Sequence, residues 1–173
     1  EARRQEAIAS MGDAAERYLK LHTASRLLKW SMEKFRETKQ GPMLTKASAI
    51  FNGLTLNSFS RLLVDADEAT PRLFGIRPSG EQVDVAGMSE GSRDQLYLAL
   101  RLAALELQVE QGLSMPLIAD DLFINFDDRR TEAGLKVLGE LSRKMQVVFL
   151  THHEHLVPLA REVLGVDLNV VQL

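Results

Sequence analysis

The first forty residues carry the pattern of one long helix. Apolar side chains recur there at intervals of three and four among Arg, Lys and Glu, at Ile8, Met11, Ala15, Tyr18, Leu28, Met32 and Phe35. Both a loose coiled-coil heptad and an ordinary amphipathic surface helix produce this spacing. Gly41 and Pro42 are expected to end the helix, and a shorter one is predicted from Leu44 to Leu54.

From Ser60 onward, short apolar segments predict strands. Three of them cover residues 61–65, 72–77 and 81–86, and Pro78-Ser79-Gly80 between the last two has the composition of a hairpin turn. After a leucine-rich helix come the following predicted elements: a strand at 115–119, a helix from about Asp128 to Met145, a strand at 146–150, a helix near 157–164 that ends at Gly165, and a closing strand at 166–173. This alternation predicts parallel strands joined by right-handed crossovers, and therefore an α/β fold with an antiparallel portion in front.

The composition narrows the possible functions. Of 173 residues, 45% are hydrophobic and 26% charged, which suits one globular domain with an extended appendage. A formal net charge of −3 gives no general attraction to nucleic acid, so DNA contact would need a local basic patch or another part of the protein. The absence of cysteine excludes disulfides, thiolate zinc sites and cysteine nucleophiles, and favours a reducing, cytoplasmic setting.

The ends of the sequence bear on location and completeness. No apolar run reaches the roughly 20 residues that span a bilayer, and the N-terminus lacks a signal-peptide pattern, so no membrane partner is expected. The sequence begins with Glu1 rather than Met. We therefore expect a further segment upstream.

Two acidic residues follow the predicted strand at 115–119. Asp120 and Asp121 stand where this apolar strand ends, and ligands of open α/β sheets bind at the carboxyl ends of strands. Adjacent carboxylates suit Mg²⁺ with phosphate oxygens, or can orient an attacking water. A helix cap or a solvated loop is the simpler interpretation of the same pair.

Three histidines follow the next predicted strand, at His152, His153 and His155 with Glu154 between them. A histidine at that position could hydrogen-bond a phosphate or a water. Zinc binding by the cluster is not favoured, because HExxH spacing is absent and consecutive residues of an extended chain point to opposite sides. Surface or capping roles are expected for two of the three.

The leucine-rich helix opens with Ser89, Gly91 and Ser92. Free backbone N–H groups, a hydroxyl and the positive end of the helix dipole would meet there, and together they favour an anion such as phosphate. An ordinary N-cap explains the same residues.

The order of the three segments matters more than any one of them. "MSEGSRDQLYLALRLA", "LIADDLFINFD" and "VVFLTHHEHL" resemble the signature motif, the Walker B motif with D-loop, and the switch histidine of ATP-binding-cassette (ABC) ATPases. The chain looks like the C-terminal head segment of SMC-related DNA repair ATPases of the SbcC type, and is similar to the YhaN-like branch. The resemblance implies that residues 45–173 form the C-terminal lobe of a P-loop NTPase head of the ABC/SMC type. Residues 1–40 would be the base of its coiled coil.

The resemblance also implies contacts to nucleotide. Ser89, Gly91 and Ser92 would bind the γ-phosphate of ATP held by the opposite protomer, and Asn125 and Asp127 match the D-loop that communicates across the dimer.

Three further residues would act in hydrolysis. Asp120 would be the Walker B aspartate, acting on Mg²⁺ through its water shell, and His152 would sense the γ-phosphate. Asp121 occupies the place of the catalytic glutamate but is one methylene shorter, which implies either that its water lies closer or that hydrolysis is slow. Glu90 departs from the family's usual glycine and puts a negative charge near the phosphate.

A phosphate loop of the form G-x-x-x-x-G-K-[ST] is absent from the sequence. "GIRPSGEQ" from Gly75 has the glycine spacing but Glu81 and Gln82 in place of Lys and Ser or Thr, and we interpret it as the hairpin turn. The chain is therefore expected to be half of a head, inactive alone. An N-terminal head segment with Walker A would complete it, and two heads would form a homodimer through sandwiched ATP.

The resemblance implies two further partners of the full-length protein, DNA and a calcineurin-like phosphoesterase nuclease. It also implies a cytoplasmic, nucleoid-associated location. Two other functions remain open from the residues alone. One is a structural dimerisation head that has lost catalysis, which the shorter Asp121 would explain. The other is a metal-dependent phosphohydrolase that uses Asp120, Asp121 and the histidines.

Overall fold

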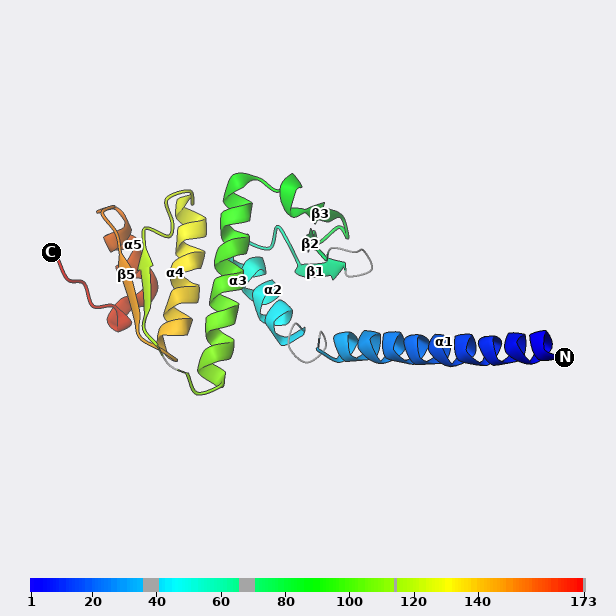
Figure 1. Cartoon of the computed structure of the whole chain (residues 1–173). Coiled ribbons are helices and arrows are strands. Elements are labelled where there is room, and N and C mark those ends of the chain that lie inside the picture. Colours follow the sequence, from blue (N-terminus) through cyan, green and yellow to red (C-terminus); the bar gives the residue numbers. More distant parts are fainter. Residues whose placement is uncertain (36–40, 66–70, 114, 173) are drawn as a thin grey trace. The chain divides into compact units, whose positions relative to one another are not determined.

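A computed structural model describes residues 1–35, 41–65, 71–113 and 115–172. The chain divides into two compact units, Glu1–Pro42 and Met43–Leu173. Each unit is described by itself below, with the elements labelled as in Figure 1.

The first unit consists mainly of helix α1 (Ala2–Phe35). From Met11 to Phe35 every side chain of α1 is exposed, including large apolar ones such as Tyr18, Leu21 and Leu28. Some of these side chains follow a seven-residue repeat, whereas others, such as Trp30, lie off it. Most helical stability in proteins comes from packing an apolar face. We therefore expect α1 to be stabilised by packing its apolar side chains against another helix. Residues 36–40, the predicted end of this helix, lie outside the described residues.

Helix α2 (Gly41–Leu54) begins earlier than the predicted Leu44. Its first residues are Gly41 and Pro42, which were expected to end the first helix, and that predicted end lies outside the described residues. Proline is tolerated there because the N–H groups of a first turn have no intrahelical partner to lose. Further along α2, Ala47, Phe51 and Leu54 are buried in the core.

The three predicted strands after Ser60 form an antiparallel sheet in the order β1-β2-β3. Their bounds are β1 (Arg61–Asp65), β2 (Arg72–Ile76) and β3 (Gln82–Asp84). The predicted turn joins β2 to β3: Gly80 has a φ of +89°, and its N–H donates to the Arg77 carbonyl at 2.9 Å. β3 is shorter than predicted because η2 (Val85–Gly87) follows, capped by the Asp84 carboxylate, which accepts from the Ala86 N–H.

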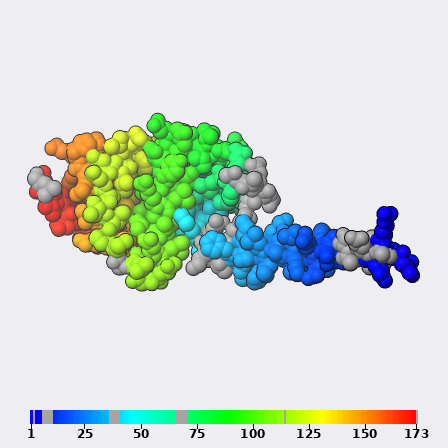
Figure 2. Space-filling model, in the orientation of Figure 1, coloured from blue at the N-terminus to red at the C-terminus, as the bar shows by residue number. Residues whose placement is uncertain are grey.

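Helix α3 (Glu90–Glu110) lies at the centre of the second unit, beside α2 and α4 in Figure 1. Leu96, Ala99 and Ala103 are fully buried. Between Gly91 and Leu107 only Tyr97 and Arg101 are exposed, and α3 reaches the surface in green in Figure 2. The leucine-rich sequence is thus explained by a helix with neighbours on nearly every side.

The parallel part of the fold follows α3. Its elements are β4 (Leu117–Asp120), α4 (Asp128–Ser142), β5 (Val147–Leu150), α5 (Leu156–Leu164) and η3 (Gly165–Asp167). β4 pairs in parallel with β5, from Leu117 opposite Val147 to Asp120 opposite Leu150, with α4 as the connection. The prediction of parallel strands is confirmed.

The two faces of the β4–β5 sheet differ. On one face, Ala119 is buried and Phe149 packs against Phe123, with ring centroids 5.3 Å apart. On the other face, Ile118, Val148 and Leu150 are exposed, Ile118 to 66%. Parallel sheets are usually packed against other segments on both faces. The composition of this face is therefore that of a buried surface, although it is exposed among the described residues.

The predicted closing strand is wrong. Residues 168–172 are described, and they belong to no strand. An extended segment becomes a strand only where the hydrogen-bonding edge of another strand meets it, and this segment makes no such ladder within the described part of the chain. None of the described helices combines the length and apolar character that crossing a membrane demands.

Candidate functional site

Asp120 and Asp121 mark the end of β4. Asp120 is the last residue of the strand, lies opposite Leu150 and is exposed. Asp121 adopts a φ of +43°, and its N–H donates to the Leu150 carbonyl at 3.0 Å. The parallel ladder therefore continues one bond past the strand, and the backbone then turns at a conformation that Asp tolerates better than most residues.

Asp121 contacts the first of the three histidines. Its Oδ2 lies 2.6 Å from His152 Nδ1, with the Asp121 side chain 21% exposed and the His152 side chain 72% exposed. The other carboxylate oxygen, Oδ1, is buried, and no hydrogen bond reaches it from the described residues. The two sequence segments predicted to share a site thus meet at one end of the sheet.

The charge state of Asp121 follows from its surroundings. Burial opposes ionisation, but the Thr151 hydroxyl and His152 favour the charged form more strongly, so the pKa of this carboxyl lies below its ordinary value. Asp121 is therefore a carboxylate at neutral pH.

The histidine segment does not remain extended after β5. The His153 N–H donates to the Thr151 hydroxyl at 3.1 Å, and the His152 and His153 rings lie 4.0 Å apart between centroids. The expectation that consecutive residues here point to opposite sides is wrong, because the chain bends at His152. His155 stands at the N-cap position of α5 but makes no side-chain capping bond.

The start of α3 is an ordinary N-cap with free N–H groups behind it. Ser89 is the N-cap residue, its hydroxyl accepts from the Ser92 N–H at 3.3 Å, and the two hydroxyls lie 2.9 Å apart. The cap accounts for Ser89 and Ser92. The N–H groups of Glu90 and Gly91 begin the helix, where no intrahelical carbonyl can reach them.

The loop after β4 lies against this helix start. Asn125 Nδ2 donates to Asp94 Oδ2 of α3 at 2.8 Å. A Cβ placed on Gly91 would stand 3.6 Å from the Asn125 carbonyl oxygen. Asp127 is the N-cap of α4, where its carboxylate accepts from the Arg130 N–H at 2.9 Å. A capping role therefore explains Asp127 in this structure.

Sequence reasoning missed the residues that support the loop. Asp94 lies one turn beyond Glu90 on α3, a spacing that could have placed it beside the site. Phe123 is buried and covers Gly134 of α4 so closely that a Cβ there would lie 2.4 Å from its ring. No local signal in the sequence links Phe123 to Gly134, because their contact depends on how α4 packs against the loop after β4.

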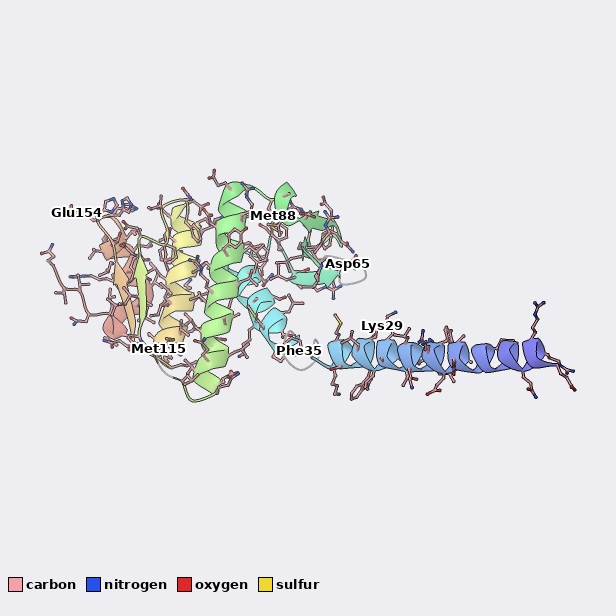
Figure 3. All side chains as sticks on the ribbon, in the orientation of Figure 1. Lys29, Phe35, Asp65, Met88, Met115 and Glu154 are labelled. Atoms are coloured by element: carbon pink, nitrogen blue, oxygen red, sulfur yellow. The ribbon has the colours of Figure 1, made fainter. Side chains whose placement is uncertain are left out.

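All three segments share one edge of the second unit. The start of α3, the loop that precedes α4 and the loop between β5 and α5 lie along the upper edge in Figure 1. Met88, directly before the α3 cap, and Glu154, directly after the first two histidines, lie on this edge in Figure 3. The arrangement brings two carboxylates, a histidine and a helix start to one side of the fold.

Comparison with known sequences gives two relatives. The chain is 26% identical over 145 residues to the uncharacterized protein YhaN of Bacillus subtilis (strain 168), a match that covers 83% of the chain and 15% of YhaN. It is 32% identical over 124 residues to the DNA double-strand break repair Rad50 ATPase of Pyrococcus abyssi, covering 71% of the chain and 14% of that protein. The chain thus spans a small part of either relative. No protein-family profile matches it.

Comparison with solved structures identifies the fold. An SMC ATPase studied for ATP-driven dimerization superposes with a TM-score of 0.59 at 16% identity, over 74% of the chain and 77% of that structure. The Smc head domain with coiled coil and joint from Pyrococcus yayanosii gives a TM-score of 0.56 at 16% identity, over 84% and 31%. The SMC head domain from Thermotoga maritima gives 0.51 at 17% identity, over 78% and 44%.

Proposed function

The chain is an SMC/SbcC-like head segment, and on that premise we propose that it supplies the signature, Walker B, D-loop and switch-histidine parts of an ATPase head. In the full-length protein, two such heads bind two ATP molecules between them and hydrolyse them slowly. The observation that carries this proposal is the Asp121–His152 pair, 2.6 Å apart where two parallel strands end.

The acidic residues fit Mg²⁺ and a water nucleophile. Asp120 offers exposed carboxylate oxygens, and Asp121 adds a buried oxygen that no hydrogen bond reaches within the described chain. Oxygen donors are those that Mg²⁺ prefers. When bound, Mg²⁺ would neutralise charge on the phosphates; Asp120 would hold it through water.

Asp121 would act on the attacking water. As a carboxylate at neutral pH it can accept a hydrogen bond from water and orient it, or take its proton. His152 fixes the outer oxygen of Asp121 in this structure, and its exposed ring can turn toward a phosphate when nucleotide arrives.

The backbone offers a reason for aspartate at this position. At a φ of +43° the short Asp side chain is favoured over longer ones, because it can hydrogen-bond locally. We infer that the turn after β4 selects Asp121 instead of glutamate. A shorter carboxylate brings its water closer to the strand, which is consistent with slow turnover.

Two features support a head completed by another segment. The sequence holds no lysine-bearing phosphate loop, although a nucleotide site of this type needs one. Ile118, Val148 and Leu150 also lie exposed on a parallel sheet. An N-terminal segment with a Walker A motif would supply the loop and cover this face, and a returning helix would pair with α1 as a coiled coil.

The dimer and its wider role extend the proposal. Ser89, Gly91 and Ser92 would meet the γ-phosphate on the opposite head, while Asn125 and Asp127 would lie close to the dimer interface. A relative named for DNA double-strand break repair supports a role in DNA repair or end processing. A place in the cytoplasm at the nucleoid is proposed by resemblance. A calcineurin-like phosphoesterase nuclease is the partner proposed by resemblance.

The proposal is tested by ATP turnover. We expect the full-length protein to hydrolyse ATP in the presence of Mg²⁺, Asp121→Asn to lose at least about 10²-fold because the base is removed, and the 173-residue chain alone to be inactive. Hydrolysis unchanged in Asp121→Asn would contradict the role of Asp121. Robust turnover by the chain alone, lost in Asp120→Ala, would contradict the half-head.

The same assays separate the alternatives. A catalytically dead structural head would bind ATP and dimerise but show no turnover above that of Asp121→Asn. A metal-dependent phosphohydrolase would cleave a simple phosphoester with the 173-residue chain alone, which the ATPase proposal does not allow.

A further inference from the structure

The bend after β5 brings two histidines close to Asp121, and the proposed ATPase cycle assigns no common role to these three side chains. Asp121, His152 and His153 each offer one ligating atom, and these three atoms all lie within 4.8 Å of one another. We propose that these three side chains form a site for a divalent transition metal, Zn²⁺ in particular, separate from the Mg²⁺ assigned to Asp120.

The donor set selects the metal class. Two imidazole nitrogens and one carboxylate oxygen suit Zn²⁺, whereas Mg²⁺ prefers oxygen ligands alone. Three protein ligands leave a fourth tetrahedral position for water. Zn²⁺ would therefore bind here without any further protein group.

The present distances are those of a hydrogen-bonded pair and not of a metal site. Asp121 Oδ2 and His152 Nδ1 are 2.6 Å apart, whereas two ligands of tetrahedral Zn²⁺ stand about 3.3 Å apart for bonds near 2.0 Å. The His152 side chain is 72% exposed, so its ring is free to make this shift. Metal binding would replace this hydrogen bond and release its proton into solvent.

The surroundings hold two of the ligands in place. The Asp121 N–H is tied to the Leu150 carbonyl, and the His153 N–H is tied to the Thr151 hydroxyl.

His155 provides a matched control. Its ring lies 5.5 Å from that of His153 between centroids, yet it is outside the three-residue group identified in the described chain. A specific site depends on His153 and not on His155. A loose attraction of metal to neighbouring imidazoles would depend on both.

Occupation of the site would stop hydrolysis, a consequence that rests on the proposed function. The metal takes both Asp121 and His152, which are the residues proposed to act on water and on the γ-phosphate. His153 has no part in that proposed chemistry. Zn²⁺ would thus inhibit the assembled head through a residue that the ATPase reaction does not require.

Binding is tested on the 173-residue chain by competition for Zn²⁺ with a chromogenic chelator. We expect one tight Zn²⁺ per chain, a loss of affinity of at least about 10-fold in His153→Ala and in Asp121→Asn, and no change in His155→Ala. Circular dichroism checks that each variant is folded. Absence of stoichiometric binding, or equal losses in His153→Ala and His155→Ala, would overturn the site.

Inhibition is tested on the full-length protein with Mg²⁺ and ATP. We expect Zn²⁺ to inhibit the unmodified protein and His155→Ala, and His153→Ala to retain turnover at the same Zn²⁺ concentration. Equal inhibition of all three would overturn the inhibitory role. Failure of the full-length protein to hydrolyse ATP would count against the proposed function, while the binding result on the chain would still decide the metal site.

Discussion

Asp121 shows how one residue combines a backbone constraint with a charge. Its left-handed φ turns the chain after β4, its N–H extends the parallel ladder, and its carboxylate meets His152. The sequence alone predicted an acidic pair after a strand and a histidine after the next one. It could not predict the bend that brings His153 to the same carboxylate, because that bend depends on a local hydrogen bond to Thr151.

The lowered pKa of Asp121 has a measurable consequence. Because the folded value lies below the ordinary 3.8, the carboxylate stabilises the fold above the unfolded pKa, and this contribution is lost as the pH falls through the folded pKa. We expect the Asp121 carboxyl to titrate below 3.8 in a ¹³C NMR experiment. His152→Ala should move this midpoint upward, with Glu132 as an internal reference. A midpoint at or above the ordinary value would contradict the described contacts.

At the scale of elements, the sequence predicted most helices and strands because their periodicity is strong. The hairpin at Gly80, the parallel pair β4–β5 and helix α5 all occur as expected. The errors lie where context decides: the second helix begins at Gly41 instead of Leu44, and the C-terminal segment needs a partner edge to become a strand. Packing of α4 beneath Phe123 was likewise invisible in the sequence.

The contact between Gly134 and Phe123 makes a prediction at this scale. Gly134→Ala would place a Cβ 2.4 Å from the Phe123 ring, which is buried and cannot move away freely. We expect a loss of about 1–3 kcal/mol in the free energy of unfolding by urea, and a disturbed loop after β4.

Gly53→Ala in α2 is the control for that experiment. Nothing lies within 4 Å of a Cβ there, and alanine favours a helix over glycine by up to about 1 kcal/mol. A Gly134→Ala variant as stable as Gly53→Ala would show that α4 does not press against Phe123.

At the scale of the whole molecule, two apolar surfaces are exposed that proteins usually bury against another segment. The described side chains of α1 are exposed from Met11 onward, and one face of the β4–β5 sheet exposes Ile118, Val148 and Leu150. The chain also spans only 15% and 14% of its two relatives. Together with the missing phosphate loop, these features support a head whose nucleotide site is assembled from more than one segment.

The central claim is that this site is completed by the opposite head, and mixing two inactive full-length variants tests it most directly. Ser89→Arg removes the signature contact, whereas Asp121→Asn removes the residue proposed to act on water. In a mixed dimer, one site combines an intact Asp121 with an intact Ser89 from the other head. The account predicts that each variant alone is inactive and that the mixture regains ATP turnover; a mixture as inactive as its components, with both variants folded and forming mixed dimers, would contradict it.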